Sequence, residues 1–325
     1  MLRDNYHRQI NYLRLSITDM CNLHCIYCQS WKEVDKKRQR DILSYEEIIR
    51  LTLLLVRLGV SRVRLTGGEP LVRQNIIYLI KELIKIKGLE EISLTTNAAK
   101  LAKLAVGLKE AGIRRINVSL DSLDKERYAR ITGGGNLSDV LAGIEEALRV
   151  GLGPLKINMV VMKGINDDEV EKFANLTLDK PIQVRFIELI PIGQQKDFWV
   201  RRFLSTNLIR KRLADNFNLI LSDGLPGNGP AKYYQITGAV GKIGFISPIS
   251  DHFCERCNRI RLTPDGHLRL CLGQNIEVNL KQVLRQGASD EELERIIVQA
   301  MSDKPAAHQF QLKSPTGRQM SAIGG

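Results

Sequence analysis

The chain has 325 residues, of which 43% are hydrophobic and 26% are charged. This composition is ordinary for a soluble globular protein and predicts one large domain or two. No apolar run reaches membrane-spanning length, because Arg50, Arg57 and Gly59 interrupt the longest, and the polar first ten residues argue against a secretory signal. We therefore expect a cytoplasmic protein without membrane contact. The net charge of +12 favours a polyanionic partner (nucleotide, nucleic acid or anionic lipid), or else reflects a generally basic surface.

The chain up to residue 190 repeats one pattern, in which a helical stretch ends at a glycine and a short β-branched run follows. In chain order, the predicted strands cover residues 12–18, 61–66, 90–96, 114–120, 155–161 and 182–189. One predicted helix runs from a capping box at Ser44 and Glu47 to about Leu58. Three further predicted helices end near Gly88, Gly112 and Gly151. This alternation predicts a parallel sheet. Because a full eight-unit barrel needs about 250 residues, we expect a partial (β/α)6 TIM-like barrel over residues 1–190.

The pattern changes after Pro191. Residues 241–250 and 259–270 are typical of short strands, and the stretch from Ser289 to Met301 is typical of a helix with Ser289 as its N-cap. We therefore expect residues 191–325 to form a smaller α+β domain that covers the open side of the barrel.

Polar motifs follow the predicted barrel strands where each strand ends. The segment Cys21–Cys28 follows the first strand and Thr66–Pro70 the second, while Thr95–Asn97 and Ser119–Asp121 end the third and fourth. In parallel α/β barrels the catalytic residues lie at the carboxyl ends of the strands. This clustering predicts an enzyme.

All six cysteines fall into two groups of three. The first group has the spacing C-x3-C-x2-C, and the second has C-x2-C-x13-C. Disulfides are a poor explanation in a reducing cytoplasm, so both groups are interpreted as ligand sets. Three thiolates on a [4Fe–4S] cluster hold three irons and leave the fourth open to a small molecule. A structural zinc site that recruits His24, or inert thiols, are the alternatives.

The first group, with Tyr27 before its last cysteine and Gly67-Gly68-Glu69-Pro70 one strand later, resembles the radical S-adenosylmethionine superfamily. Within it, the chain resembles the GTP 3′,8-cyclase family along essentially its whole length. The segments that carry this resemblance are YLRLSITDMCNLHCIYC, RLTGGEPL, LTTN, INVSLDSLD, RFIEL, FCERCNRIRLTPDGHLRLCL and the terminal MSAIGG.

The resemblance implies two [4Fe–4S] clusters, one on Cys21, Cys25 and Cys28 and one on Cys254, Cys257 and Cys271. The open iron of the first cluster would bind S-adenosylmethionine, and that of the second would bind the guanine of GTP. The S-adenosylmethionine contacts implied are Tyr27, Gly68, Ser119 and Ile190. The GTP contacts implied are Arg14, Arg64, Thr95, Lys156, Arg259, Ile260 and Arg261. Arg259 and Arg261 would share one face of a strand, which suits a triphosphate.

The resemblance also implies the reaction and the partners. A 5′-deoxyadenosyl radical would take hydrogen from C3′ of GTP, and C3′ would then bond to C8 of guanine in the first step of molybdenum cofactor biosynthesis. The tail residues Gly324 and Gly325 would reach into the active site. We expect a flavodoxin- or ferredoxin-like electron donor, hand-off of the product to cyclic pyranopterin monophosphate synthase, a monomer or homodimer, and no nucleic acid.

Simpler interpretations remain open at several positions. Arg14 and Arg64 could form salt bridges in the barrel, Ser119 could be a helix N-cap, and Gly133–Gly135 could be a plain loop and not a phosphate cradle. The basic run 32–40 is interpreted as a solvated loop. Other possible functions are a radical enzyme that acts on RNA or a peptide, an electron carrier, or a zinc-dependent nucleic-acid-binding protein.

The sequence departs from the family's pattern at a few positions. Gln29-Ser30 replace Met-Pro, Ile190 replaces a methionine, and Ala98 and His7 each replace a glycine. None of these departures removes a cysteine ligand.

Overall fold

A computed structural model describes residues 1–28, 41–192, 196–223, 229–310 and 318–325. The barrel strands and their helices alternate along the chain, as the sequence predicts. The strands are β1 (Tyr12–Ser16), β2 (Arg62–Thr66), β3 (Glu91–Thr96), β4 (Arg115–Ser119), β5 (Leu155–Val161) and β6 (Ile182–Glu188). The helices are α1 (Tyr45–Arg57), α2 (Ile76–Leu83), α3 (Leu101–Glu110), α4 (Lys125–Thr132), α5 (Leu137–Arg149) and α6 (Val170–Asp179).

Local sequence signals account for several of these boundaries. The Ser44 hydroxyl accepts a hydrogen bond from the Glu47 amide at 3.2 Å, and Glu47 accepts one from the Ser44 amide at 2.7 Å, which confirms the predicted capping box. The stretch expected to be a single helix ending near Gly151 is instead two helices. Gly133, with φ of 68°, ends α4 in the left-handed conformation before α5 begins.

The rest of the chain adds short elements on both sides of the barrel. They are α7 (Lys196–Arg202), α8 (Thr206–Asn216), β7 (Leu219–Leu221), β8 (Lys232–Ile236), β9 (Lys242–Ile246), β10 (Arg259–Leu262), β11 (His267–Arg269), β12 (Glu277–Asn279), α9 (Leu280–Arg285), α10 (Asp290–Ala300) and α11 (Met320–Ile323). Ser289 caps α10 by accepting a hydrogen bond from the Glu292 amide at 3.2 Å, as predicted.

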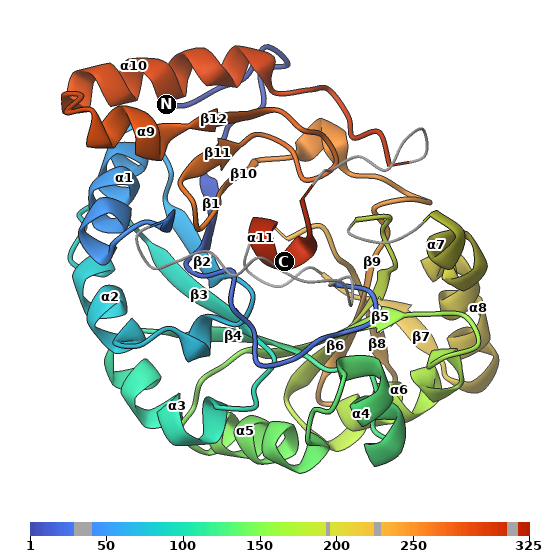
Figure 1. The fold of residues 1–325 in the computed structure, drawn as a ribbon. Helices are drawn as coiled ribbons and strands as arrows, with labels where there is room; N and C mark the ends of the chain where they lie inside the picture. Colours follow the sequence, from blue (N-terminus) through green and yellow to red (C-terminus); the bar gives the residue numbers. More distant parts are fainter. Residues whose placement is uncertain (29–40, 193–195, 224–228, 311–317) are drawn as a thin grey trace.

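All strands belong to one sheet of order β12-β11-β10-β1-β2-β3-β4-β5-β6-β9-β8-β7. β10 pairs in parallel with β1 and β9 in parallel with β6, so the carboxyl-terminal strands extend the barrel at both of its edges. The sheet is curved but not closed, and the helices α1 to α5 lie outside it (Figure 1). This confirms the expected partial barrel. The division at residue 190 stays a prediction, because part of the second segment continues the same sheet.

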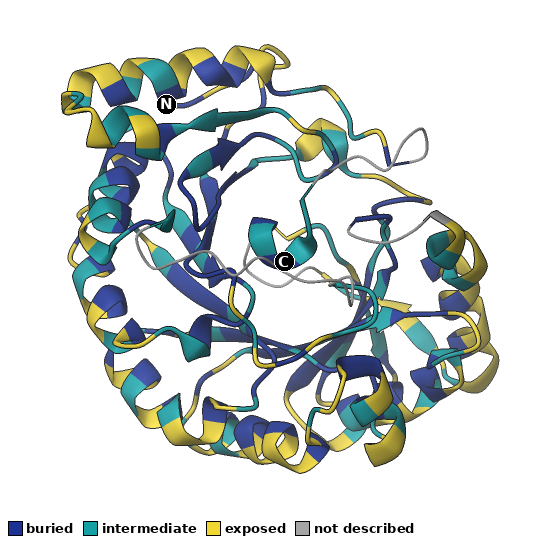
Figure 2. Ribbon diagram, in the orientation of Figure 1, coloured by how far each residue is buried: buried dark blue, intermediate teal, exposed yellow. Residues whose placement is uncertain are grey.

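The hydrophobic core lies between the outer face of the sheet and the inner faces of the helices. Leu13, Leu15, Val63 and Leu65 have no exposed side-chain surface and pack in this layer. Figure 2 shows the same division, with buried residues along the strands and exposed residues on the outer helix faces. No helix in the described part of the chain is long and apolar enough to cross a bilayer. The short helix α11 lies inside the curve of the sheet (Figure 1).

Candidate active site

A cavity of about 340 Å³ opens inside the barrel and has both cysteine triads in its wall. The residues proposed from the sequence that line it are Arg14, Cys21, Cys25, Tyr27, Cys28, Arg64, Gly68, Thr95, Ser119, Ile190, Cys254, Cys257, Arg259, Arg261, Cys271 and Gly325. The two triads are far apart in sequence, so only the curvature of the sheet brings them to one space.

The loop of the first triad is fixed by hydrogen bonds to the barrel. The Tyr27 hydroxyl donates to Asp121 at 2.6 Å, and the His24 amide donates to the Thr132 carbonyl at 2.9 Å. Burial raises the pKa of Cys21 to about 11 and that of Cys28 to about 12. In the metal-free protein these thiols therefore hold their protons, which ligation would release.

The segment Gly67–Pro70 packs directly against this loop. A Cβ atom on Gly67 would lie 2.5 Å from the Thr18 carbonyl oxygen, and one on Gly68 would lie 2.3 Å from that of Met20. Glycine is therefore required at both positions. The buried carboxylate of Glu69 accepts hydrogen bonds from the Thr96 hydroxyl at 2.7 Å and the Asn97 amide at 2.6 Å, which joins this segment to the end of β3.

The second triad lies where β10 and β11 join the barrel. Cys254 begins a short 3₁₀ turn (Cys254–Arg256), Cys257 ends that turn, and Cys271 follows β11. Burial would raise the pKa of Cys257, but the positive charges of Arg259 and Lys304 outweigh it and lower that pKa to about 7.

The chemistry and placement of the two donor sets fit iron–sulfur clusters. All six thiols are free, and each set of three lines the cavity. Within the described residues, no three His, Cys, Asp or Glu side chains are placed to hold a single metal ion. Thiolates on a cubane each bind a separate iron, so they need not converge on one point. His24 is exposed and does not belong to the cavity wall, so the structure does not support the zinc alternative.

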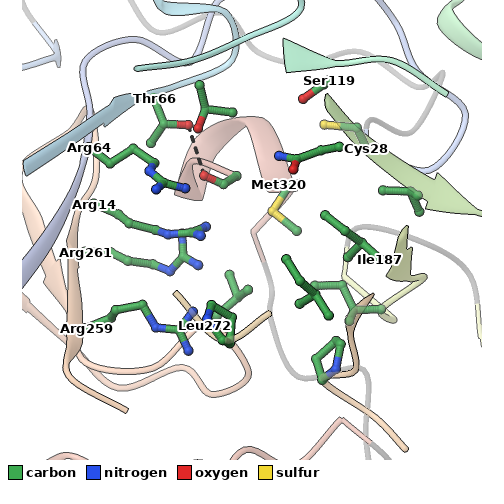
Figure 3. Close-up of a pocket in the computed structure, with 18 of the residues that line it drawn as sticks. Arg14, Cys28, Arg64, Thr66, Ser119, Ile187, Arg259, Arg261, Leu272 and Met320 are labelled. Carbon is green, nitrogen blue, oxygen red and sulfur yellow. Dashed lines mark hydrogen bonds between the residues drawn. The ribbon is translucent and has the colours of Figure 1, made fainter. Parts of the chain in front are cut away.

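Arginines cover one wall of the cavity. Arg261, Arg14 and Arg64 lie side by side because β10, β1 and β2 pair in this register. Their side chains and that of Arg259 project from one side of the cavity toward Met320 and Cys28 (Figure 3). Arg185 of β6 also lines the cavity. Among the described residues none of these five arginines forms a salt bridge with a carboxylate, so the salt-bridge interpretation of Arg14 and Arg64 is not supported.

The crowding of these cations has an electrostatic consequence. Burial, followed by the charges of Arg261 and Arg64, lowers the pKa of Arg14 well below its ordinary value. Burial and the charge of Arg259 lower the pKa of Arg261 to about 9. The Nε atom of Arg14 is buried without a hydrogen-bond partner. A polyanion in the cavity would relieve both the repulsion and the unsatisfied donor.

The carboxyl-terminal tail enters the same cavity. Arg261 donates a hydrogen bond to the Gly324 carbonyl, and the Thr66 hydroxyl donates one to a main-chain carboxylate oxygen of Gly325 at 3.1 Å. Gly324 has φ of 89°, and a Cβ atom there would lie 2.8 Å from Cβ of Ser16. The tail is therefore inserted, and glycine is required at its penultimate position.

Three of the site residues proposed from the sequence, Ile260, Lys156 and Gly324, do not line the cavity. Ile260 is buried on the opposite face of β10 from Arg259 and Arg261, within the hydrophobic core. Lys156 is buried in β5, where burial and the charges of Arg185 and Arg64 lower its pKa to about 7. Gly324 is buried, whereas Gly325 lines the cavity.

The structure also decides the remaining local alternatives. Asp124, and not Ser119, is the N-cap of α4, while Ser119 ends β4 in the cavity wall. Gly133 faces the cysteine loop, since a Cβ there would lie 3.0 Å from the His24 carbonyl oxygen, which favours the plain-loop interpretation. The run 32–40 and Gln29-Ser30 lie outside the described residues.

Sequence reasoning missed Arg185 and Lys304. A signal for Arg185 was available, because it is a charged residue inside a predicted barrel strand, like Arg14 and Arg64. No sequence signal marked Lys304.

The open parallel sheet, with three cysteines after β1, defines the class of protein. The family model described as the Radical SAM superfamily matches residues 15–177, half of the chain, and the chain belongs to that superfamily, which uses S-adenosylmethionine and a [4Fe–4S] cluster. The model described as Molybdenum Cofactor Synthesis C matches residues 182–310.

Two solved chains of Streptococcus suis SuiB share the fold. The structure bound to S-adenosylmethionine has a TM-score of 0.58 at 16% identity, covering 89% of this chain and 68% of that one. The structure titled SuiB alone has a TM-score of 0.59 at 15% identity, covering 92% and 67%.

Closer relatives identify the particular family. The chain is 48% identical to the GTP 3′,8-cyclase of Moorella thermoacetica (strain ATCC 39073 / JCM 9320) and 46% identical to that of Alkaliphilus metalliredigens (strain QYMF), with 100% of each chain covered in both comparisons. The chain belongs to the GTP 3′,8-cyclase family.

Proposed function

We propose that the chain converts GTP into (8S)-3′,8-cyclo-7,8-dihydroguanosine 5′-triphosphate with S-adenosylmethionine, as the first step of molybdenum cofactor biosynthesis. The observation that carries the proposal is one cavity whose wall holds two cysteine triads and five arginines, none of which forms a salt bridge with a carboxylate in the described residues. The proposed reaction needs a radical source, a bound triphosphate and a second ligand set close together, and one shared cavity allows this. The full-length relatives named GTP 3′,8-cyclase support the same reaction.

The first triad would hold a [4Fe–4S] cluster through Cys21, Cys25 and Cys28. With S-adenosylmethionine bound, this cluster would supply the radical chemistry that removes a hydrogen atom from C3′ of the ribose. Tyr27, Gly68, Ser119 and Ile190 line the wall on this side and are proposed to position S-adenosylmethionine. Gly68 allows close approach, because it has no Cβ.

The arginine wall is proposed to bind the triphosphate. Arg14, Arg64 and Arg259 each present a guanidinium to the cavity, and guanidinium groups bind phosphate oxygens with paired N–H donors. Thr95 lies at the end of β3 on the same cavity wall. Lys156 is buried in β5 and is not among the residues that line the cavity, and its proposed role is to add positive potential near the phosphates.

The second triad is proposed to hold a second [4Fe–4S] cluster through Cys254, Cys257 and Cys271, with its open iron facing guanine. Binding at both ends of GTP would fix the ribose between them, and such positioning is a large part of catalysis. A flavodoxin- or ferredoxin-like electron donor, and hand-off of the product to cyclic pyranopterin monophosphate synthase, complete the proposal.

Anaerobic reconstitution with iron and sulfide, followed by incubation with reductant, S-adenosylmethionine and GTP, tests this function. We expect about eight irons per chain and the cyclised nucleotide as product. Cys25→Ala should abolish S-adenosylmethionine cleavage, whereas Cys257→Ala should keep part of that cleavage and lose cyclisation. Protein that holds only zinc, or only about four irons, would contradict the two-cluster proposal. Cleavage without any change in GTP would point to another substrate.

A further inference from the structure

Lys304 is a buried lysine beside the second triad. Only 2% of its surface is exposed. Its Nζ atom donates to the carbonyl oxygen of Leu270 at 2.5 Å and to that of Arg259 at 2.9 Å, and it lies 3.9 Å from Sγ of Cys257. Leu270 directly precedes Cys271. The ammonium group therefore joins the backbone beside two of the three proposed ligands.

The charge of Lys304 has no carboxylate partner among the residues that the structure describes. Arg8 provides the contrast, since it also reaches this region, donating to the Cys254 carbonyl at 2.8 Å. Arg8, however, forms a salt bridge with Asp4 at 2.6 Å, in which both side chains are almost fully buried. A buried ammonium without an opposite charge is strongly unfavourable, so a negative charge nearby would stabilise the ammonium form of Lys304.

Within the described part of the chain, the negative charges that act on Lys304 are the thiolates of Cys257 and Cys271 in the second triad. A [4Fe–4S] core on three thiolates carries net negative charge, which increases on reduction, and hydrogen bonds to its sulfurs tune its potential. We propose that Lys304 is the built-in counter-ion of the second cluster: it positions Cys257 and Cys271 and stabilises the reduced cluster. This inference rests on the second cluster of the proposed function. Lys304 is a positioning residue, because it lies behind the cysteines and does not line the cavity.

The test isolates the second cluster in the full-length chain. In a background of Cys21→Ala, Cys25→Ala and Cys28→Ala, only the second triad remains to bind iron. Three further variants are made in this background. Lys304→Met removes charge and donor, and Lys304→Gln removes the charge but keeps an N–H donor. Lys281→Met is the matched control, because Lys281 is a half-buried lysine that donates to a backbone carbonyl, that of Asp41, at 2.6 Å. The readouts are iron and sulfide per chain and the midpoint potential from a redox titration followed by electron paramagnetic resonance.

We expect a more negative midpoint potential in both Lys304 variants and the parental value in the control. At a fixed applied potential the reduced-to-oxidised ratio should fall about tenfold, which corresponds to ~59 mV for a one-electron couple. Lys304→Met should also bind less iron, because Arg259 and Leu270 lose a shared hydrogen-bond donor.

Parental potential and parental iron content in both Lys304 variants would overturn the proposal. Loss of iron in Lys304→Met with parental potential in Lys304→Gln would also overturn it, because Lys304 would then act only through hydrogen bonds. If the background with Lys304 intact binds no iron, the second cluster itself is wrong, and the proposed function fails at that point before Lys304 is tested.

Discussion

Arg261 donates a hydrogen bond to the carbonyl oxygen of Gly324, so a strand of the barrel and the end of the chain meet inside the cavity. Arg261 also lies next to Arg14 in the register of β1 and β10, within the wall proposed for the triphosphate. The position of the tail and the binding of the substrate therefore depend on one guanidinium group. A change in the tail should alter how the substrate is presented, even when both cysteine triads are intact.

Gly324→Ala should uncouple radical formation from cyclisation. The new Cβ would lie 2.8 Å from Cβ of Ser16 and 2.9 Å from Cγ2 of Thr66, at a φ of 89° that side chains rarely adopt. We expect S-adenosylmethionine cleavage to continue while the yield of cyclised nucleotide per 5′-deoxyadenosine falls at least about tenfold, since misplacement by 1 Å can cost 10²-fold. Gly107→Ala, a substitution on α3 with only ordinary contacts, is the control. Equal coupling in the two variants would show that the tail is not part of the active site.

Loss of an arginine from the cavity wall should weaken GTP binding through its phosphates. Truncation of one partner of a buried charge pair costs ~2–5 kcal/mol, and ~1.4 kcal/mol is tenfold in affinity, so Arg14→Ala or Arg259→Ala should reduce GTP affinity by about thirtyfold or more. Guanosine, which has no phosphate, should bind both variants as it binds the parent. Calorimetry with both ligands separates these effects. Arg212→Ala removes an exposed arginine that pairs with Glu171 at 2.6 Å and serves as control. Unchanged GTP affinity in the cavity variants would assign these arginines a structural role.

The cysteines of the metal-free chain should differ in reactivity at neutral pH. The pKa of Cys257 is lowered to about 7, whereas burial raises that of Cys21 to about 11 and that of Cys28 to about 12. The thiolate is the reactive form, and it prevails above the pKa. Between pH 6 and 8 we therefore expect the alkylation rate of Cys257 to rise with pH and then level off, while Cys21 and Cys28 stay slow throughout. Mass spectrometry after brief iodoacetamide treatment measures each site. Faster labelling of Cys21 than of Cys257 at pH 7 would contradict the assigned charge environment.

Two positions where this chain departs from its family adopt the conformation that favours glycine. His7 has φ of 60° and Ala98 has φ of 62°. The left-handed region costs a side-chain-bearing residue about 1–2 kcal/mol, which Ala98→Gly would remove. Ala99, the next residue, has no such φ, so Ala99→Gly should only add disorder to the unfolded chain. We expect Ala98→Gly to be more stable than Ala99→Gly by about 1 kcal/mol in urea unfolding of the metal-free protein. The reverse order would show that the lost methyl contact outweighs the backbone strain.

The sequence by itself determined the features that depend on near neighbours in the chain. The capping box at Ser44, the strand–helix alternation and the spacing of Cys21, Cys25 and Cys28 all express interactions within a few residues. Such patterns can be recognised without knowledge of the fold, because backbone hydrogen bonding and the reach of a ligand set act over short distances. The same holds for the polar motifs at the strand ends, since parallel pairing places those ends at one edge of a sheet.

Only the tertiary structure decided which distant segments meet. β10 pairs with β1 and β9 with β6, so Arg261 comes beside Arg14, and both triads and the last residue of the tail line one cavity. The burial of Lys304 beside Cys257 depends on the same pairing. These contacts join residues that are remote in sequence, and their energies come from sheet registry and burial in the assembled barrel. No local pattern at either residue specifies such a partner, because the partner is chosen only when the sheet curves and encloses the cavity.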